Sequence, residues 1–162
     1  MQKADLEKLG FSGFLSIEYL RNNLDQIPNL AGVYAIILPE GFKKNFLVKG
    51  SGGFFKGRDP NLNEGALEVE WVKQSNIIYF GKAGGSSSSA TLRKRLKQYF
   101  DFGAGKAVGH YGGRLIWQIH NSEDLLVAWK AIPDEEPAVA ETRLIQTFRN
   151  QFGQRPFANL KD

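Results

Sequence analysis

The sequence predicts a single α+β domain, because runs typical of strands and runs typical of helices alternate along its 162 residues. Three short apolar segments, residues 31–38, 77–82 and 125–132, have the β-branched and aromatic composition of buried strands. Two longer segments, residues 91–102 and 138–152, repeat apolar side chains at helical spacing. A chain of this length can bury a substantial core in one domain.

The overall composition excludes several classes of site. The chain has no cysteine, which rules out disulfides, zinc–thiolate centres and thiol catalysis. No apolar run approaches the ~18 residues of a membrane span, and the N-terminus lacks a signal-peptide pattern, so we expect no membrane association and a cytoplasmic setting. The net charge of +4 is a mild basic bias that is compatible with a nucleic-acid partner.

Residues 1–30 are interpreted as an N-terminal extension that contains one short helix. Ser16 can cap this helix, Ile17 and Leu20 have helical spacing, and Pro28 marks a stop. We expect the extension to pack against the core of residues 31–162.

The first strand, residues 31–38, is almost continuously apolar, which indicates a central strand covered on both faces. A long insertion of about residues 40–74 follows, rich in glycine and charge. It mixes cations with aromatic side chains, a pattern that suits phosphate contacts and base stacking: Lys43, Lys44, Lys49, Lys56 and Arg58 with Phe46, Phe54 and Phe55. The alternative is a small hairpin subdomain with solvated lysines and a few buried phenylalanines.

The second strand, residues 77–82, carries Tyr79 and leads through a flexible GGSSSS bridge, residues 84–89, into a basic helix. Leu92, Leu96, Tyr99 and Phe100 form the apolar face of that helix, whereas Lys94 and Lys97 fall on its wet side. Arg95 lies at the edge of the apolar stripe, beside Tyr99, where a cation is well placed for phosphate.

A glycine-rich loop, residues 103–113, contains His110, which either touches DNA, relays a proton or is incidental. Arg114 follows two glycines that permit close backbone approach, so it is a candidate phosphate contact. Residues 114–119 are ambiguous. After the strand at 125–132, Pro137 suits the first turn of the last helix, and Gly153 suits its end.

Glu141 projects near the buried face of the last helix, where a carboxylate needs a partner. That partner is either a cation such as Arg95 or a divalent metal such as Mg²⁺, and a purely structural ion pair is the alternative. Tyr34 and Tyr79 could lie on adjacent strands. Near a metal or guanidinium one of them could act as a general base, or both could simply be core aromatics.

In order along the chain, GVY at residues 32–34, YFG at 79–81, Arg95, Glu141 and Asn159 resemble the GIY-YIG nuclease domain. Four segments of the chain are similar to segments of the family's excision-repair members: YFGKAG (which includes Lys82), LRKRLKQYF, AETRLIQTF and PFANLK. The resemblance spans residues 31–162. It departs from the family in the 44 residues between Tyr34 and Tyr79, where a short connection is usual.

The resemblance implies a small three-stranded antiparallel sheet flanked by helices, with Tyr34 and Tyr79 side by side on its first two strands. It also implies hydrolysis of DNA phosphodiesters with one Mg²⁺ or Mn²⁺ ion. In that scheme Glu141 holds the metal, Tyr34 takes a proton from the attacking water and Arg95 neutralises the phosphate. The supporting residues would be Lys82, Tyr99 and Asn159.

The expected partner is therefore DNA, contacted by cationic and loop side chains: Lys56, Arg58, Lys94, Lys97, His110 and Arg114. Two other interpretations stay open at this stage. One is a catalytically inactive nucleic-acid-binding module of the same fold, supported by the basic charge and the insertion. The other is a structural or protein-interaction domain that uses the same scaffold.

Overall fold

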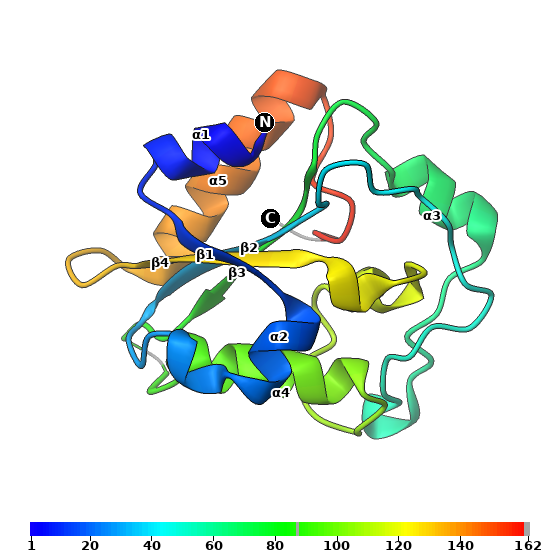
Figure 1. Ribbon diagram of the computed structural model, residues 1–162, viewed down its shortest axis with the longest axis horizontal. Coiled ribbons are helices and arrows are strands. Elements are labelled where there is room, and N and C mark those ends of the chain that lie inside the picture. Colours follow the sequence, from blue (N-terminus) through cyan, green and yellow to red (C-terminus); the bar gives the residue numbers. More distant parts are fainter. Residues whose placement is uncertain (87, 161–162) are drawn as a thin grey trace.

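Four antiparallel strands form the central sheet of the computed structural model, which describes residues 1–86 and 88–160 (Figure 1). Their order across the sheet is β1-β4-β2-β3. The strands are β1 (Ser12–Ser16), β2 (Gly32–Ile37), β3 (Ile77–Ala83) and β4 (Leu126–Ala131). The α+β class is confirmed, and β2, β3 and β4 are the three predicted strands, but the predicted total of three is wrong.

The unpredicted strand, β1, lies at the edge of the sheet beside β4. Its pairing is interrupted by a bulge between Gly13 and Leu15, and both Gly13 and Phe14 have positive φ. A Cβ atom at Gly13 would lie 2.6 Å from the ring of Trp129, so the strand passes directly over that indole. Such a short, bulged strand lacks the alternating pattern by which strands are recognised in a sequence.

Two pairs of helices cover the two faces of the sheet (Figure 1). α1 (Lys3–Lys8) and α5 (Pro137–Phe152) pack on one face, and α2 (Ile17–Asn22) and α4 (Leu92–Gly103) on the other. The expected caps are present: the Ser16 hydroxyl accepts from the Tyr19 N–H, and Gly153 ends α5 in the left-handed conformation. Within the described residues, no helix has the length and apolarity needed to cross a membrane.

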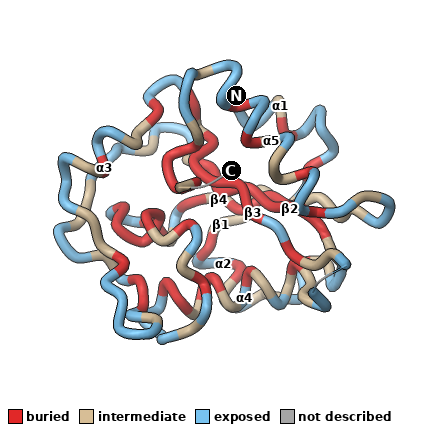
Figure 2. The backbone as a smooth tube through the Cα atoms, turned by 180° about the vertical axis from the view of Figure 1, so that it is seen from behind, coloured by how far each residue is buried: buried red, intermediate tan, exposed pale blue. Residues whose placement is uncertain are grey.

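β2 is the central strand that its apolar sequence predicts, since all six of its residues are buried (Figure 2). Tyr34 and Ile36 belong to the core layer under α4, whereas Val33, Ala35 and Ile37 belong to the layer under α5. β3 pairs with β2 on one side and, within the described residues, has no strand on its other side. The edge of β3 is therefore the place where a cleft can open between the two helical layers.

The insertion contains α3 (Glu64–Glu70) and a 3₁₀ turn, Phe55–Gly57, but no hairpin among the described residues. Phe46 anchors it: the ring stacks on that of Phe157 with centroids 5.6 Å apart, and the backbone forms an antiparallel β-bridge with Ile119. The ambiguous stretch after the glycine loop is a 3₁₀ helix, Arg114–Gln118. One residue of the predicted flexible bridge, Ser87, lies outside the described residues.

Candidate active site

Tyr34 and Tyr79 lie diagonally across the β2–β3 pair, with ring centroids 6.0 Å apart. Tyr34 is opposite Gly81, and a Cβ atom there would lie 2.3 Å from Cζ of Tyr34. The Tyr34 ring therefore lies directly over this glycine, which explains why glycine ends the YFG motif. The side-by-side arrangement expected from the resemblance is present.

The two phenols differ in their access to solvent. Tyr34 is fully buried and its hydroxyl lies 3.4 Å from Nε2 of His110, whereas Tyr79 lines a surface cleft. Burial raises the pKa of Tyr34 well above its usual value. Burial also raises the pKa of Tyr79 to about 12; Glu141 adds to this rise and Arg95 opposes it. Of the two phenols, Tyr79 is therefore the one at the cleft, and the role of proton acceptor that the resemblance gives to Tyr34 stays a prediction.

The cleft has a volume of about 580 Å³ and opens along the free edge of β3. α5 forms one wall, the loop at 111–114 forms another, and the C-terminal segment and insertion close the ends. Its lining combines phenols, cations, a carboxylate and an amide with a few apolar groups: Arg58, Tyr79, Tyr111, Gly112, Gly113, Arg114, Glu141, Ile145, Ala158, Asn159 and Leu160. Among the cleft-lining residues, Glu141 supplies the only carboxylate.

Glu141 sits one turn into α5, and 17% of its side chain is exposed. Its Oε2 atom lies 2.8 Å from Nζ of Lys82, which projects from β3. The sequence suggested a cation such as Arg95, or a divalent metal, as the partner of this carboxylate, and the cation that contacts it is Lys82. The Lys82 side chain is 44% exposed, so solvent ions or a phosphate can replace either partner of the ion pair.

Two of the predicted DNA contacts, Arg58 and Arg114, line the same cleft as Tyr79 and Glu141. The Arg114 guanidinium stacks on the ring of Tyr111 at 4.2 Å, and its Nε is buried with no hydrogen-bond partner among the described residues. Tyr111 is held in turn by a 3.1 Å hydrogen bond to the Asp59 carbonyl. The only signal for this platform in the sequence is an aromatic residue three positions before an arginine.

Arg95 does not enter this cleft. Its Nη1 donates to Oε1 of Gln98 at 2.9 Å and to the Gly109 carbonyl at 3.4 Å. It lines a neighbouring groove of about 560 Å³ that also contains Lys82. The charged lining of this groove is four cations and one carboxylate: Lys82, Lys94, Arg95, Lys97 and Asp101. The Lys82–Glu141 pair joins the groove to the cleft.

Asn159 secures the free edge of β3 next to Tyr79. Its Oδ1 accepts from the Phe80 N–H and its Nδ2 donates to the Phe80 carbonyl, both at 2.8 Å. These are the two backbone groups that an edge strand would otherwise leave unpaired. The Asn159 amide thus takes the place of a neighbouring strand at Phe80. This is the geometry of the outer-shell position that the resemblance implies for Asn159.

Tyr99, a predicted supporting residue, is buried rather than exposed to the cleft. Its hydroxyl donates to the Gly113 carbonyl at 2.8 Å and thereby fixes the loop wall. Gly113 has a φ of 73°, and a Cβ atom there would lie 2.8 Å from Cζ of Tyr79. The loop therefore reaches Tyr79 only because this position is glycine.

His110 is fully buried, with its ring 4.3 Å from the ring of Tyr99. We correct the sequence-based expectation and assign it no contact with nucleic acid, because its imidazole reaches no surface. The remaining predicted contacts, Lys56, Lys94 and Lys97, are exposed. Nζ of Lys56 lies 5.4 Å above the ring of Phe55, in the insertion.

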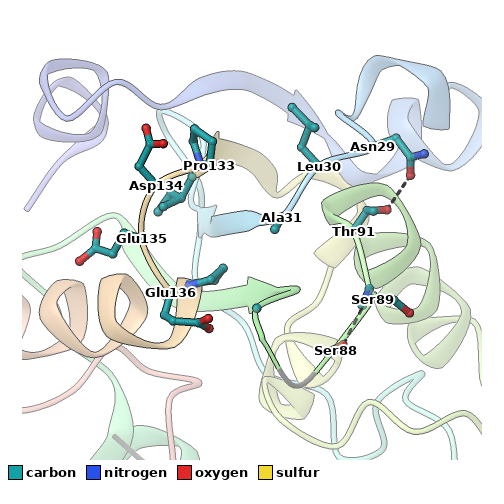
Figure 3. Close-up of a pocket in the computed structure, with 14 residues that line it drawn as sticks. Asn29, Leu30, Ala31, Ser88, Ser89, Thr91, Pro133, Asp134, Glu135 and Glu136 are labelled. Atoms are coloured by element: carbon teal, nitrogen blue, oxygen red, sulfur yellow. Dashed lines mark hydrogen bonds between the residues drawn. The ribbon is translucent and has the colours of Figure 1, made fainter.

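A further depression, of about 650 Å³, lies where the chain enters β2 and α5 (Figure 3). Glu135 pairs with Arg143, Glu136 accepts from the Ser86 N–H, and Asp134 adds a third carboxylate to the lining. None of the predicted site residues lines it. Its carboxylates would repel a polyanion, so we place the candidate site in the cleft beside β3.

Comparison of the chain with protein-family models, with curated protein sequences and with solved structures gives no match.

Proposed function

We propose that this protein is a metal-dependent endonuclease that hydrolyses DNA phosphodiester bonds. The observation that carries the proposal is that Tyr79, Glu141 and Arg114, from three separate elements, border one open cleft. In hydrolysis of a phosphodiester a phenol can orient water, a carboxylate can hold a cation and a guanidinium can neutralise the phosphate. The ordered resemblance to the GIY-YIG nucleases supports the same assignment.

Glu141 is the residue suited to hold Mg²⁺ or Mn²⁺. Mg²⁺ is commonly bound through one or two carboxylates together with waters and substrate phosphates, so a single cleft carboxylate fits its needs. When bound, the ion would supply positive charge at the scissile phosphate and the leaving oxygen. Binding there requires Oε2 of Glu141 to exchange its contact with Lys82, whose ammonium is then available to a phosphate oxygen.

Tyr79 orients the attacking water in this proposal. Because its pKa is raised to about 12, the phenol is neutral at pH 7, and its oxygen can accept a hydrogen bond from water. Attack forms a new bond between the water oxygen and phosphorus and breaks the ester bond to the leaving oxygen. The attacking water releases a proton to solvent in the open cleft and the leaving oxygen takes one up from solvent, which gives a phosphate monoester and an alcohol. Arg114 lies in the same cleft to neutralise the charge that builds on the phosphate.

The groove beside the cleft extends the binding surface for the DNA backbone. Its cations on α4 are Lys94, Arg95 and Lys97. They lie on the groove side of Lys82, away from the proposed position of the scissile phosphate in the cleft. Arg95 is therefore proposed as a contact to a flanking phosphate, a change from the catalytic role that the resemblance implies. Such contacts release counterions, so binding should weaken steeply with salt.

Nicking of supercoiled plasmid in Mg²⁺ or Mn²⁺ tests the proposal, with Glu141→Gln as the inactive variant. Glu40→Gln is the matched control, since Glu40 is an exposed glutamate outside the cleft. We expect wild type and Glu40→Gln to nick equally and Glu141→Gln to lose activity. Salt-sensitive DNA binding without nicking by any of the three proteins would favour the second candidate, an inactive nucleic-acid-binding module, which the cationic groove also supports.

A further inference from the structure

His110 is a buried polar side chain to which the proposed chemistry gives no role. Its Nε2 lies 3.4 Å from the Tyr34 hydroxyl, and its Nδ1 is buried with no hydrogen-bond partner among the described residues. Tyr34 in turn lies beneath Tyr79, the phenol that reaches the cleft. The imidazole is therefore the innermost member of a line that runs from His110 through Tyr34 to Tyr79.

The unpartnered Nδ1 indicates which ring nitrogen carries the proton. A buried N–H without an acceptor is rarer in proteins than an unfilled acceptor, so the proton belongs on Nε2 and the lone pair on Nδ1. Burial, with a smaller contribution from Arg95, holds the pKa of His110 well below its usual value, which keeps the ring neutral. In this tautomer Nε2–H donates to the Tyr34 oxygen.

That hydrogen bond holds the Tyr34 ring, which packs against Tyr79 with ring centroids 6.0 Å apart. Tyr79 in turn lines the cleft, so the imidazole supports the cleft phenol through the ring of Tyr34.

We infer that His110 is a positioning residue whose Nε2–H holds the hydroxyl of Tyr34 and so fixes the ring that supports Tyr79 at the cleft. The hydrogen bond between His110 and Tyr34 is a property of the folded protein, and its consequence for the reaction rests on the proposed nuclease function. His110 touches neither substrate nor solvent, so it acts through the two tyrosines.

NMR of the ¹⁵N-labelled protein tests the tautomer directly. The chain has two histidines, and the other, His120, is exposed and serves as the reference for a ring in exchange with water. We expect His110 to show a slowly exchanging proton on Nε2 and an unprotonated Nδ1 throughout the neutral range. Protonation on Nδ1, or fast exchange like that of His120, would overturn the assignment.

Matched variants test the consequence for catalysis. His110→Gln can place an amide donor near the Nε2 position, whereas His110→Leu keeps an apolar side chain without a donor. We expect His110→Leu to lower kcat by about 10- to 100-fold, the range for partners that orient a reacting group, and His110→Gln to restore most of it. DNA affinity should change by less than about twofold in both, because the residue is buried.

Equal losses of kcat in the Gln and Leu variants, or no loss in Leu, would overturn the positioning role. A Tyr34→Phe background supplies the second check, since removing His110 there should cause no further loss. Failure of the nuclease itself gives a different result: wild type would cut no DNA, while the tautomer spectrum would still decide the hydrogen-bond assignment.

Discussion

The ammonium of Lys82 lies 2.8 Å from a carboxylate oxygen of Glu141 and ties the edge strand β3 to helix α5. Because Lys82 lines the cationic groove and Glu141 lines the cleft, this pair marks the boundary between the two depressions. A polyanion that crosses from one depression to the other must pass directly over it.

Replacing Lys82 by Met should reduce DNA cleavage more than it reduces stability. The pair is partly exposed, so its loss should cost less than about 1 kcal/mol of unfolding free energy. Loss of a cation between two phosphate sites should lower kcat/KM by at least ~10-fold, because a charge-assisted contact is worth about 1.5–3 kcal/mol. Lys82→Arg, which keeps the charge, should retain more activity than Lys82→Met in the same cleavage and urea-denaturation measurements.

The two tyrosines should respond differently to removal of the hydroxyl. Tyr79→Phe should lower single-turnover cleavage by about 10²-fold or more with little change in stability, since its hydroxyl faces the cleft. Tyr34→Phe should cost about 1–3 kcal/mol of stability, because it leaves the buried imidazole of His110 without its partner. A stability loss confined to Tyr79→Phe would contradict the positions described for the two phenols.

Gly81→Ala tests the contact between β3 and Tyr34. Its Cβ would lie 2.3 Å from the Tyr34 ring, so we expect a loss of about 1–3 kcal/mol or more in unfolding free energy, and displacement of the tyrosine. Gly65→Ala is the control, because it lies in α3 with its nearest atom at 3.5 Å. That substitution should be neutral or stabilising by up to about 1 kcal/mol.

Asn159→Ala should loosen the edge of β3. It removes the hydrogen-bond partners of the Phe80 N–H and carbonyl. Each unpaired group lowers the free energy of unfolding by about 1–3 kcal/mol unless water replaces the amide. Hydrogen exchange at the Phe80 amide should accelerate more than exchange at the central strand β2. Unchanged protection at Phe80 would show that Asn159 does not hold the edge.

The buried tyrosines predict that stability falls in alkaline solution. Burial raises the folded-state pKa of Tyr79 to about 12 from the ordinary 10.0, so the neutral phenol is the favoured form in the fold. Its contribution to stability is complete below about pH 10 and is lost as the pH rises from there through 12. Tyr34 and Tyr99, with pKa values raised well above 10.0, act in the same direction. Urea titrations across this range should show the decline, and Tyr79→Phe should reduce its slope.

The core strands and the two long helices could be predicted because their burial is nearly continuous or strictly periodic. β2 has six buried residues in succession, and the apolar face of α4 repeats at helical spacing. β1 could not be predicted in the same way, since its bulge and two positive φ values break the alternation. Its place in the sheet depends on packing against Trp129, a residue far along the chain.

The candidate site was predictable in its residues but not in their exposure. Pairing of β2 with β3 brings Tyr34 and Tyr79 together, yet only the surrounding loops decide which hydroxyl reaches solvent. The Lys82–Glu141 pair joins residues 59 positions apart, and neither side chain alone identifies the other. Arg114, and not Arg95, lines the cleft because the loop before Arg114 folds back over Tyr79, at a glycine with positive φ.

Single-turnover cleavage of a labelled DNA duplex in Mg²⁺, with DNA affinity measured on the same samples, tests the central claim most directly. Wild type should cut, and Glu141→Gln should cut at least about 100-fold more slowly while binding DNA equally well or more tightly. Equal cleavage by both proteins, or cleavage by wild type that persists in EDTA, would contradict the assignment of the Glu141 cleft as a metal-dependent nuclease site.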